Sequence, residues 1–253
     1  MSGRRALVTG ASGGLGREMA RQLAARGFRV AVTGRRQAEL CQTAQLVESE
    51  GQQALPLVGT VCDPQVVACH AEAVRQRWGG LDWLILNAGI GDAVDARRFD
   101  GRVCREVLAT NLGGAVNWLA AVLPWMVEAG SGTVAGISSL AAWRGLPRSG
   151  AYSASKAALA TLLESARVDL RGSGVRVVTV FPGFIRSRGV PSPDDHGKPF
   201  LLGLQDGVRR VLDGIEKGRP VVHFPKRLSW PFRHLVRHLP APAFDWLMAR
   251  LAP

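Results

Sequence analysis

The stretch Arg5-Ala-Leu-Val-Thr9-Gly10-Ala-Ser12-Gly13-Gly14-Leu15-Gly16 decides the fold. Its apolar first half predicts a buried β-strand, and its glycines predict a tight turn that leads into a helix. Glycines at such a turn let the backbone approach a pyrophosphate, while the helix N-terminus offers free N–H groups and positive potential. The opening of the chain therefore predicts an α/β fold whose first turn binds phosphate.

The rest of the chain alternates short apolar runs with longer amphipathic ones. Seven runs are candidate strands: Arg5–Thr9, Arg29–Thr33, Ala54–Val58, Leu81–Asn87, Thr133–Ser138, Arg176–Phe181 and Pro220–Phe224. Helical periodicity predicts helices over Gly14–Arg26, Gln37–Glu50, Pro64–Trp78, Val103–Glu128, Ala151–Arg171 and Gln205–Lys217. Parallel strands need such crossover segments. We expect a Rossmann-type three-layer α/β/α sandwich with a mostly or fully parallel, doubly wound sheet of about seven strands.

The length and composition suit one large domain with a small addition. With 253 residues, 47% of them hydrophobic, we expect a single catalytic domain over residues 1–225 and an amphipathic, basic, helical extension over 226–253. The four cysteines form no Cys-x-x-Cys pair, so we expect reduced cysteines and no metal site.

The formal net charge of +12 favours an acidic partner. Nucleic acid is not expected, because the basic residues are spread along the chain and no nucleic-acid motif is present. Neither a signal sequence nor an uninterrupted apolar stretch of bilayer length is apparent, so we expect a cytoplasmic protein.

The second predicted strand indicates which phosphate is bound. It ends in Thr33-Gly34-Arg35-Arg36, without the carboxylate that accepts the ribose hydroxyls of NAD. Because a guanidinium binds phosphate in a bidentate manner, Arg35 and Arg36 predict the 2′-phosphate of NADP(H). The alternative is that both are solvated arginines at a helix entry.

Tyr152 and Lys156 form a candidate catalytic pair. A phenol is a poor acid at neutral pH unless a neighbouring cation stabilises its phenolate. Positions i and i+4 share one helix face, so Lys156 can stand beside Tyr152. Alone this spacing is typical of an exposed helical pair, but Ser139 follows a buried strand thirteen residues earlier and favours a catalytic interpretation.

With these pieces the chain resembles the classical short-chain dehydrogenases/reductases over roughly residues 5–225. The matching motifs are Thr9-Gly-x-x-x-Gly14-x-Gly16, Asn87-Ala88-Gly89, Thr-Asn111-Leu-Gly-Gly, Ser138-Ser139, Tyr152-x-x-x-Lys156 and Pro182-Gly183. The resemblance implies a catalytic tetrad of Asn111, Ser139, Tyr152 and Lys156. In it Ser139 binds the substrate oxygen, Tyr152 exchanges its proton, Lys156 lowers the tyrosine pKa, and Asn111 holds a relay water. A structural amide that bonds to backbone is the alternative for Asn111.

The resemblance also implies the remaining cofactor contacts. They are Thr60, Val61, Asn87, Ala88, Gly89, Pro182, Gly183, Ile185 and Ser187, together with Tyr152 and Lys156. Thr60 stands where the family usually has an aspartate against the adenine. Asp63 then reads as the N-cap of the helix that starts at Pro64.

The substrate is indicated mainly by apolar residues. A loop over residues 184–204, with Phe184 and Phe200, and the segment with Trp143 and Leu146 predict a pocket for a lipophilic ketone or aldehyde. Alternatively, Arg144, Arg148, Arg186 and Arg188 recognise a coenzyme A-linked or other acyl ketone. A catalytically silent sensor or scaffold that binds NADPH is the alternative to an enzyme.

The extension combines aromatic and basic residues, with Pro231, Pro240 and Pro242 as expected breaks between helices near Phe232–Leu239 and Ala243–Leu251. One interpretation is peripheral contact with an anionic membrane, as its similarity to membrane-associated hydroxysteroid dehydrogenase-like reductases suggests. The other is a tail packed over the substrate pocket or a partner subunit. The family resemblance implies a homodimer, with a tetramer as an alternative.

Overall fold

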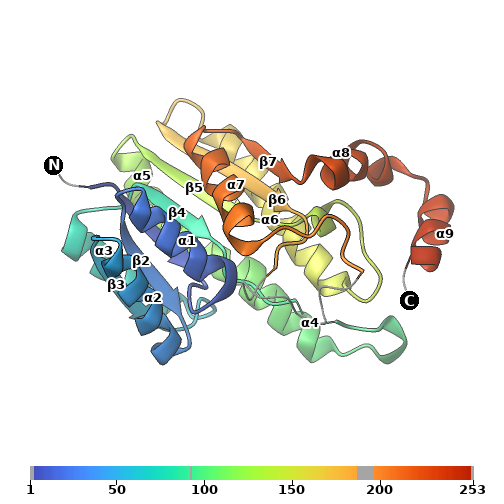
Figure 1. The fold of residues 1–253 in the computed structure, drawn as a ribbon, viewed down its shortest axis with the longest axis horizontal. Helices are drawn as coiled ribbons and strands as arrows, with labels where there is room; N and C mark the ends of the chain where they lie inside the picture. The colour runs from blue at the N-terminus through green and yellow to red at the C-terminus, as the bar shows by residue number, and fades with distance from the viewer. Residues whose placement is uncertain (1–2, 92, 187–196, 252–253) are drawn as a thin grey trace.

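A computed structural model describes residues 3–251 except 92 and 187–196, and it contains a seven-stranded, fully parallel sheet (Figure 1). The strands are β1 (Arg5–Thr9), β2 (Arg29–Gly34), β3 (Ala54–Val58), β4 (Trp83–Leu86), β5 (Gly132–Ile137), β6 (Val175–Pro182) and β7 (Val221–Phe224). Their order is β3-β2-β1-β4-β5-β6-β7. The predicted fold class is confirmed.

The strand order reverses next to β1, which pairs with β2 on one side and with β4 on the other. Leu7 lies opposite Ala31 in β2 and opposite Leu84 in β4. At such a switch point the connections leave on opposite faces of the sheet and open a crevice at its carboxyl edge. The candidate site residues that follow β1, β2, β4, β5 and β6 therefore meet at this edge.

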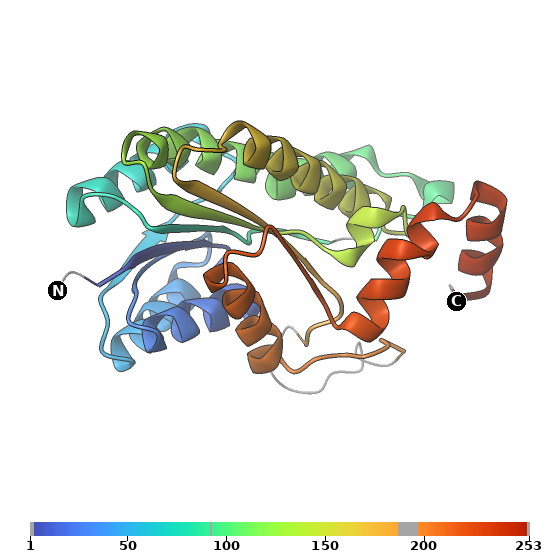
Figure 2. The same cartoon turned by 90° about the horizontal axis from the view of Figure 1, so that it is seen from above.

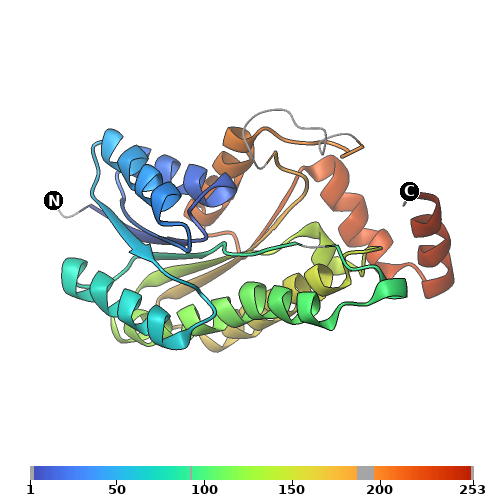
Figure 3. The same ribbon diagram turned by 90° about the horizontal axis from the view of Figure 1, so that it is seen from below.

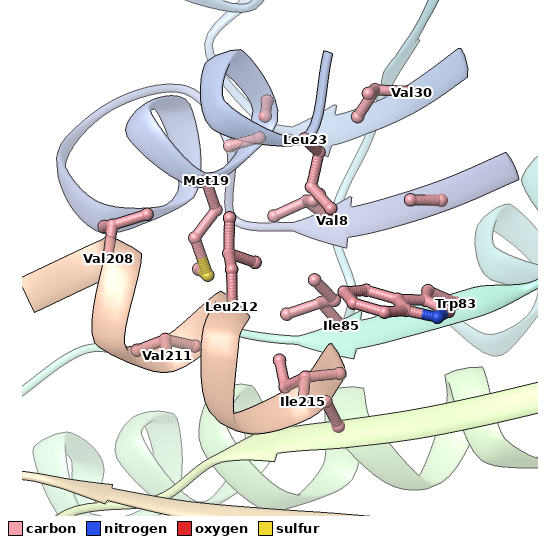
Figure 4. Packing of buried hydrophobic residues seen from close by; sticks show 14 of the residues in the cluster. Val8, Met19, Leu23, Val30, Trp83, Ile85, Val208, Val211, Leu212 and Ile215 are labelled. Carbon is pink, nitrogen blue, oxygen red and sulfur yellow. The ribbon is translucent and has the colours of Figure 1, made fainter. Parts of the chain in front are cut away.

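Helices cover both faces of the sheet (Figure 2). On one face lie α1 (Gly14–Ala25), α2 (Gln37–Ser49) and α7 (Leu204–Glu216); on the other lie α3 (Pro64–Trp78), α4 (Gly101–Leu108), α5 (Gly114–Glu128) and α6 (Gly150–Asp169). Figure 4 shows Met19 of α1 and Leu212 of α7 packed over Val8 and Ile85 of the sheet. The other face buries Trp118 of α5 and Leu159 of α6. The central strands are thus buried on both sides, as their apolar sequences require, whereas Pro56 and Val58 of the edge strand β3 are exposed.

Asp63 starts α3 as predicted. Its carboxylate accepts hydrogen bonds from the backbone N–H groups of Gln65 (2.8 Å) and Val66 (3.3 Å), and Pro64 occupies the first turn, where no N–H partner is needed. Gly79 ends the helix in the left-handed conformation, at φ 74°.

The single helix expected over Val103–Glu128 differs from the structure. The helix starts earlier, because Asp100 caps the N–H groups of Arg102 and Val103, and a π-helical turn at Ala109–Gly113 separates α4 from α5. Gly101–Glu128 is also long and apolar enough to cross a bilayer, with a mean hydropathy of 1.3, a property that core helices share. Here Trp118 of this segment is fully buried in the core.

The extension is helical, but its first helix was predicted in the wrong place. It contains α8 (Lys226–His234), a short 3-10 helix at Val236–His238 and α9 (Ala241–Leu251). α8 runs through Pro231, where a break was expected. Tertiary contacts explain this, since Ser229 of α8 is completely buried and its hydroxyl lies 2.8 Å from Nδ1 of His223 in β7. Both helices lie beyond the carboxyl end of β7 (Figure 1).

Candidate active site

The glycines of the first turn are required by contacts with the end of β4. Gly10 has φ 69°, and a Cβ atom there would lie 2.8 Å from Cα of Ala88. A Cβ atom on Gly16 would collide with the carbonyl of Gly10 and lie 2.8 Å from the amide nitrogen of Asn87. The turn is therefore packed directly on the Asn87-Ala88-Gly89 segment.

Thr9 and Asn87 fix these two segments to each other. The Thr9 hydroxyl accepts the backbone N–H groups of Asn87 and Ala88, both at 2.9 Å. In return the Asn87 amide donates to the Thr9 carbonyl at 2.8 Å. The position of Asn87 is thus explained by polar contacts within the chain.

The first turn offers unused polar groups. α1 begins at Gly14 with no side-chain cap, so its first N–H groups have no side-chain acceptor. The Ser12 hydroxyl is buried and has no hydrogen-bond partner among the described residues. A Cβ atom on Gly34 would collide with this hydroxyl. The residues present fit a phosphate-bearing nucleotide, which would supply the missing acceptors.

Arginines surround this turn. Arg35 is exposed and has no side-chain hydrogen bond or ion pair within the described part of the chain, whereas Arg36 donates to the Ser12 carbonyl at 3.0 Å and pairs with Glu39 at 3.1 Å. Arg17 of α1 also donates to the Ser12 carbonyl at 3.0 Å. Arg17 was not predicted from the sequence, although its place in the first turn of α1 is a usable signal.

The other predicted contacts on this side are partly structural. The Thr60 hydroxyl accepts the N–H of Cys62 at 3.2 Å. Val61 is buried beside Gly114, and its carbonyl accepts the Asn117 amide at 2.9 Å. Thr60 thus shapes its own turn, and Val61 ties that turn to α5.

Lys156 is buried beside the ring of Tyr152. Its Nζ donates to the Ile137 carbonyl of β5 at 2.8 Å and lies 5.7 Å from the centre of the Tyr152 ring. Burial lowers the pKa of Lys156 to about 8. At neutral pH the ammonium therefore keeps its proton, but holds it more weakly than a solvated lysine does.

The pKa of Tyr152 in this structure moves in the direction opposite to the expectation. Burial raises it, and a hydrogen bond with Ser139 opposes that rise. Desolvation penalises the phenolate. Ser139 is held in place at the start of the 3-10 helix Leu140–Trp143, where its hydroxyl accepts the N–H of Ala141 at 3.2 Å.

Asn111 lies in the π-helical turn and bonds to backbone. Its side-chain oxygen accepts the N–H of Ile90 at 2.8 Å, and its amide donates to the Ile90 carbonyl and to the Ser155 hydroxyl, both at 2.9 Å. These contacts support the structural alternative for Asn111. A Cβ atom on Gly89 would lie 3.1 Å from Asn111 Oδ1 and 3.2 Å from Lys156 Nζ, so glycine keeps this centre compact.

The residues expected to flank a nicotinamide end β6. Pro182 closes the strand, and the Gly183 N–H donates to the Phe224 carbonyl at 2.7 Å. A Cβ atom on Gly183 would lie 3.0 Å from Pro225, and Ile185 packs on Gly207 of α7. Ser187 lies outside the described residues.

The four predicted pocket residues separate in the structure. Leu146 lines an apolar hollow of about 560 Å³. Trp143 instead stacks on Phe181, with ring centres 5.0 Å apart. Phe184 and Phe200 are 39% and 49% exposed and do not line the hollow.

Two tail anchors were not anticipated. Arg144, considered above as an anion-binding residue, donates to the Leu239 carbonyl at 2.8 Å and lies 3.9 Å from the centre of the Phe244 ring. His223 bonds to Ser229 and lies 3.0 Å from the Lys226 ammonium. Burial, with nearby positive charge, lowers the pKa of His223 to about 4, so it is neutral at physiological pH. The tail is thus tied to the edge of the sheet that carries Ser139.

All four cysteines are free, and no group of three His, Cys, Asp or Glu residues within the described ranges is arranged to hold a metal ion.

Comparison with known proteins assigns this chain to a family. A family model described as short chain dehydrogenase matches residues 4–195. The chain belongs to the short-chain dehydrogenase family. Its members are oxidoreductases that act on small molecules and usually form oligomers. The expected resemblance to the short-chain dehydrogenases/reductases is confirmed.

Two relatives agree with this assignment. An uncharacterized oxidoreductase of Myxococcus xanthus is 43% identical over 251 residues, which cover 99% of this chain and 98% of that protein. The ketoacyl reductase HetN of a Nostoc species is 32% identical over 204 residues, 81% of this chain and 71% of that protein.

Two solved structures share the fold. A short-chain dehydrogenase/reductase of Burkholderia phymatum, solved with NAD, has a TM-score of 0.84 at 21% identity and covers 92% of both chains. A variant actinorhodin polyketide ketoreductase, solved with NADPH, has a TM-score of 0.83 at 24% identity and covers 90% of this chain and 97% of that one.

Proposed function

We propose that this protein is an NADP(H)-dependent oxidoreductase that interconverts a carbonyl group and an alcohol on a lipophilic substrate. The observation that carries the proposal is the meeting of Tyr152, Ser139 and buried Lys156 at the carboxyl edge of the sheet. The open glycine turn lies at the same edge. The relative named ketoacyl reductase supports carbonyl reduction as the reaction class.

The choice of NADP(H) rests on charge. No carboxylate follows β2, and Arg35, Arg36 and Arg17 gather around the turn that carries the unpartnered Ser12 hydroxyl. Of the three, Arg35 has no side-chain partner within the described residues and is free to bind a 2′-phosphate. Arg36 and Arg17 both donate to the Ser12 carbonyl, and Gly34, the residue before Arg35, packs against Ser12.

The chain's own residues can supply the proton that the carbonyl oxygen takes up when it is reduced. Bound nicotinamide supplies the hydride in this family of reactions. Ser139 would bind the substrate oxygen, and Tyr152, whose raised pKa keeps it protonated at neutral pH, would donate its proton to that oxygen. The Lys156 ammonium would stabilise the phenolate that remains. Asn111 holds the backbone at Ile90, which keeps the loop after β4 beside this centre.

A homodimer fits the exposed apolar side chains of the helices opposite α1. Leu108 of α4, Val116 of α5 and Val168 of α6 are 38%, 44% and 59% exposed. A second copy that covers them would remove this apolar surface from water.

A peripheral membrane contact of the otherwise cytoplasmic protein is a further part of the proposal. Trp230 and Trp246 are 54% and 57% exposed and have the basic residues of α8 and α9 beside them. Flotation with vesicles of anionic lipid should carry the full chain, and carry a chain that ends at Pro225 less. Equal flotation of the two contradicts the contact.

A substrate screen tests the main proposal. We expect purified protein to oxidise NADPH, followed by its absorbance, with apolar ketones or aldehydes and to prefer NADPH over NADH. Tight binding of NADPH without turnover of any carbonyl or alcohol would instead indicate a silent sensor or scaffold.

A further inference from the structure

An apolar hollow of about 560 Å³ lies between three segments that are distant in sequence. They are the loop after β4, the loop between β5 and α6, and helix α9; Figure 3 shows α9 and the loop before α4 at the same end of the molecule. The side chains that matter most are Val94, Phe99, Leu146, Pro147, Phe244 and Met248. A cavity of this size suits a small ligand.

The hollow adjoins the reacting tyrosine. Ala151, which lines it, immediately precedes Tyr152. A Cβ atom on Gly91 would lie 3.3 Å from the Tyr152 ring, and three residues later Val94 lines the hollow. The Val94 N–H also donates to the Arg148 carbonyl at 2.9 Å, which joins the two loops. The hollow thus lies next to the backbone of Tyr152 and to the loop that packs on its ring, while Ser139, Tyr152 and Lys156 are not among its lining residues.

The chemistry of the walls selects a hydrocarbon. Apart from Arg148 and Asp245, no charged side chain among the described residues lines the hollow. Phe99 has 69% of its surface exposed, which leaves an aromatic ring uncovered beside the apolar walls. Covering such surface with a ligand is favourable in proportion to the area removed from water.

The wall formed by α9 is fixed in place. Phe244 is only 6% exposed, and the Arg144 guanidinium lies over its ring at 3.9 Å while it bonds to the Leu239 carbonyl. Arg144 directly follows the 3-10 helix that Ser139 starts. The far wall is therefore tied to the loop that carries Ser139.

We infer that this hollow binds the hydrocarbon chain of the substrate and that α9 limits the chain length accepted. This inference rests on the proposed function for the position of the carbonyl. The substrate class is then a straight-chain carbonyl compound, with the reacting carbon near Tyr152 and the chain between Leu146 and Met248.

Cys104 provides a test that needs no turnover. It lines the hollow and is partly buried, whereas Cys41 and Cys69 are exposed elsewhere on the surface. We expect tridecanone, a long straight-chain methyl ketone, to slow the alkylation of Cys104 several-fold, measured by peptide mass spectrometry, and pentanone to have little effect. Cys41 and Cys69 serve as internal references. Unchanged alkylation of Cys104 at the solubility limit of tridecanone would overturn the inference. Protection of Cys104 that depends on protein concentration and not on tridecanone would also overturn the inference, because a second copy of the protein would then fill the hollow.

A pair of variants on α9 gives the kinetic test. Ala249 lines the hollow and Ala243 does not, and both are exposed. For methyl ketones of increasing length, kcat/KM of the unaltered protein should rise about fourfold per methylene until the hollow is full. Ala249→Trp should end that rise at shorter chains, and Ala243→Trp should leave it unchanged. Identical chain-length profiles for all three proteins would contradict the inference.

The two tests separate the inference from the proposed function. If tridecanone protects Cys104 but no carbonyl compound is reduced, the hollow binds chains and the proposed function fails. If ketones are reduced with no dependence on chain length and no protection of Cys104, the proposed function stands and the inference fails.

Discussion

The catalytic edge and the tail are held in different ways. Around Tyr152, polar side chains bond to backbone atoms of neighbouring strands and turns: Lys156 to Ile137, Asn111 to Ile90 and Asn87 to Thr9. The α9 wall is mainly apolar and partly exposed, and Arg144 ties it down. Polar networks tolerate little change, whereas apolar surfaces accept substitutions of similar size. In the function we propose, the first region sets the type of reaction and the second sets which substrates are accepted.

The largest effect is expected at the centre of the first region. Tyr152→Phe keeps the ring and removes the proton donor, so turnover should fall by about 10²–10⁴-fold, the usual contribution of general acid–base catalysis. NADPH binding, followed by fluorescence titration, should change little. Retained turnover in this variant would show that Tyr152 is not the acid.

Lys156→Met should separate catalysis from stability. Turnover should fall at least tenfold, because the phenolate loses its cation. Burial lowers the pKa of Lys156 from 10.5 to about 8, which corresponds to about 3 kcal/mol against the charged form in the fold. The lost bond to Ile137 offsets about 1 kcal/mol, so denaturant unfolding at pH 7 should show a gain of about 2 kcal/mol.

The lowered pKa of Lys156 also determines how the stability of the fold depends on pH. Between about pH 8 and 10.5 the unfolded chain binds the lysine proton and the fold does not, so this group makes stability rise with pH in that window. In Lys156→Met the contribution should disappear. A variant that is less stable than the parent at pH 7 would argue against a strained, buried ammonium.

Arg35→Asp should change the preference between the two cofactors. Loss of a charge-assisted bond to phosphate, with a repulsive carboxylate in its place, should lower the NADPH-to-NADH ratio of kcat/KM by about 10–100-fold. Arg77→Asp, on the exposed surface of α3, makes the same change in net charge and should leave the ratio unaltered. Equal ratios in both variants would place the 2′-phosphate elsewhere.

The smallest effect is expected at Arg144, whose hydrogen bonds hold the C-terminal tail in place. Arg144→Leu removes the bonds to the tail carbonyls, so trypsin should cleave within α8 and α9 several-fold faster than in the parent. Reduction of short ketones should be nearly unchanged, because Ser139 and Tyr152 remain in place. Arg77→Leu is the control, and a cleavage rate like that of the control would show that Arg144 does not anchor the tail.

Sequence predicted most of the first region and little of the second. Strand pattern, glycine turn and the Tyr152–Lys156 spacing are local signals that the fold class requires, and the seven parallel strands appear as expected. The π-helical turn at Asn111 and the partners of Arg144 depend on contacts between distant segments, which no local pattern carries. For the same reason Pro231 lies within α8, the helix that Ser229 holds against His223 of β7. Trp143, expected in the pocket, instead stacks on Phe181. No sequence pattern indicates that pairing.

The most direct test of the central claim follows the hydride itself. NADPH that carries deuterium at the transferable position of its nicotinamide should be incubated with the protein and a straight-chain ketone, and the product analysed by mass spectrometry. The account predicts an alcohol with deuterium on the carbinol carbon from the parent protein and almost none from Tyr152→Phe. Oxidation of the cofactor without deuterium in an alcohol product, or equal incorporation by the two proteins, would contradict it.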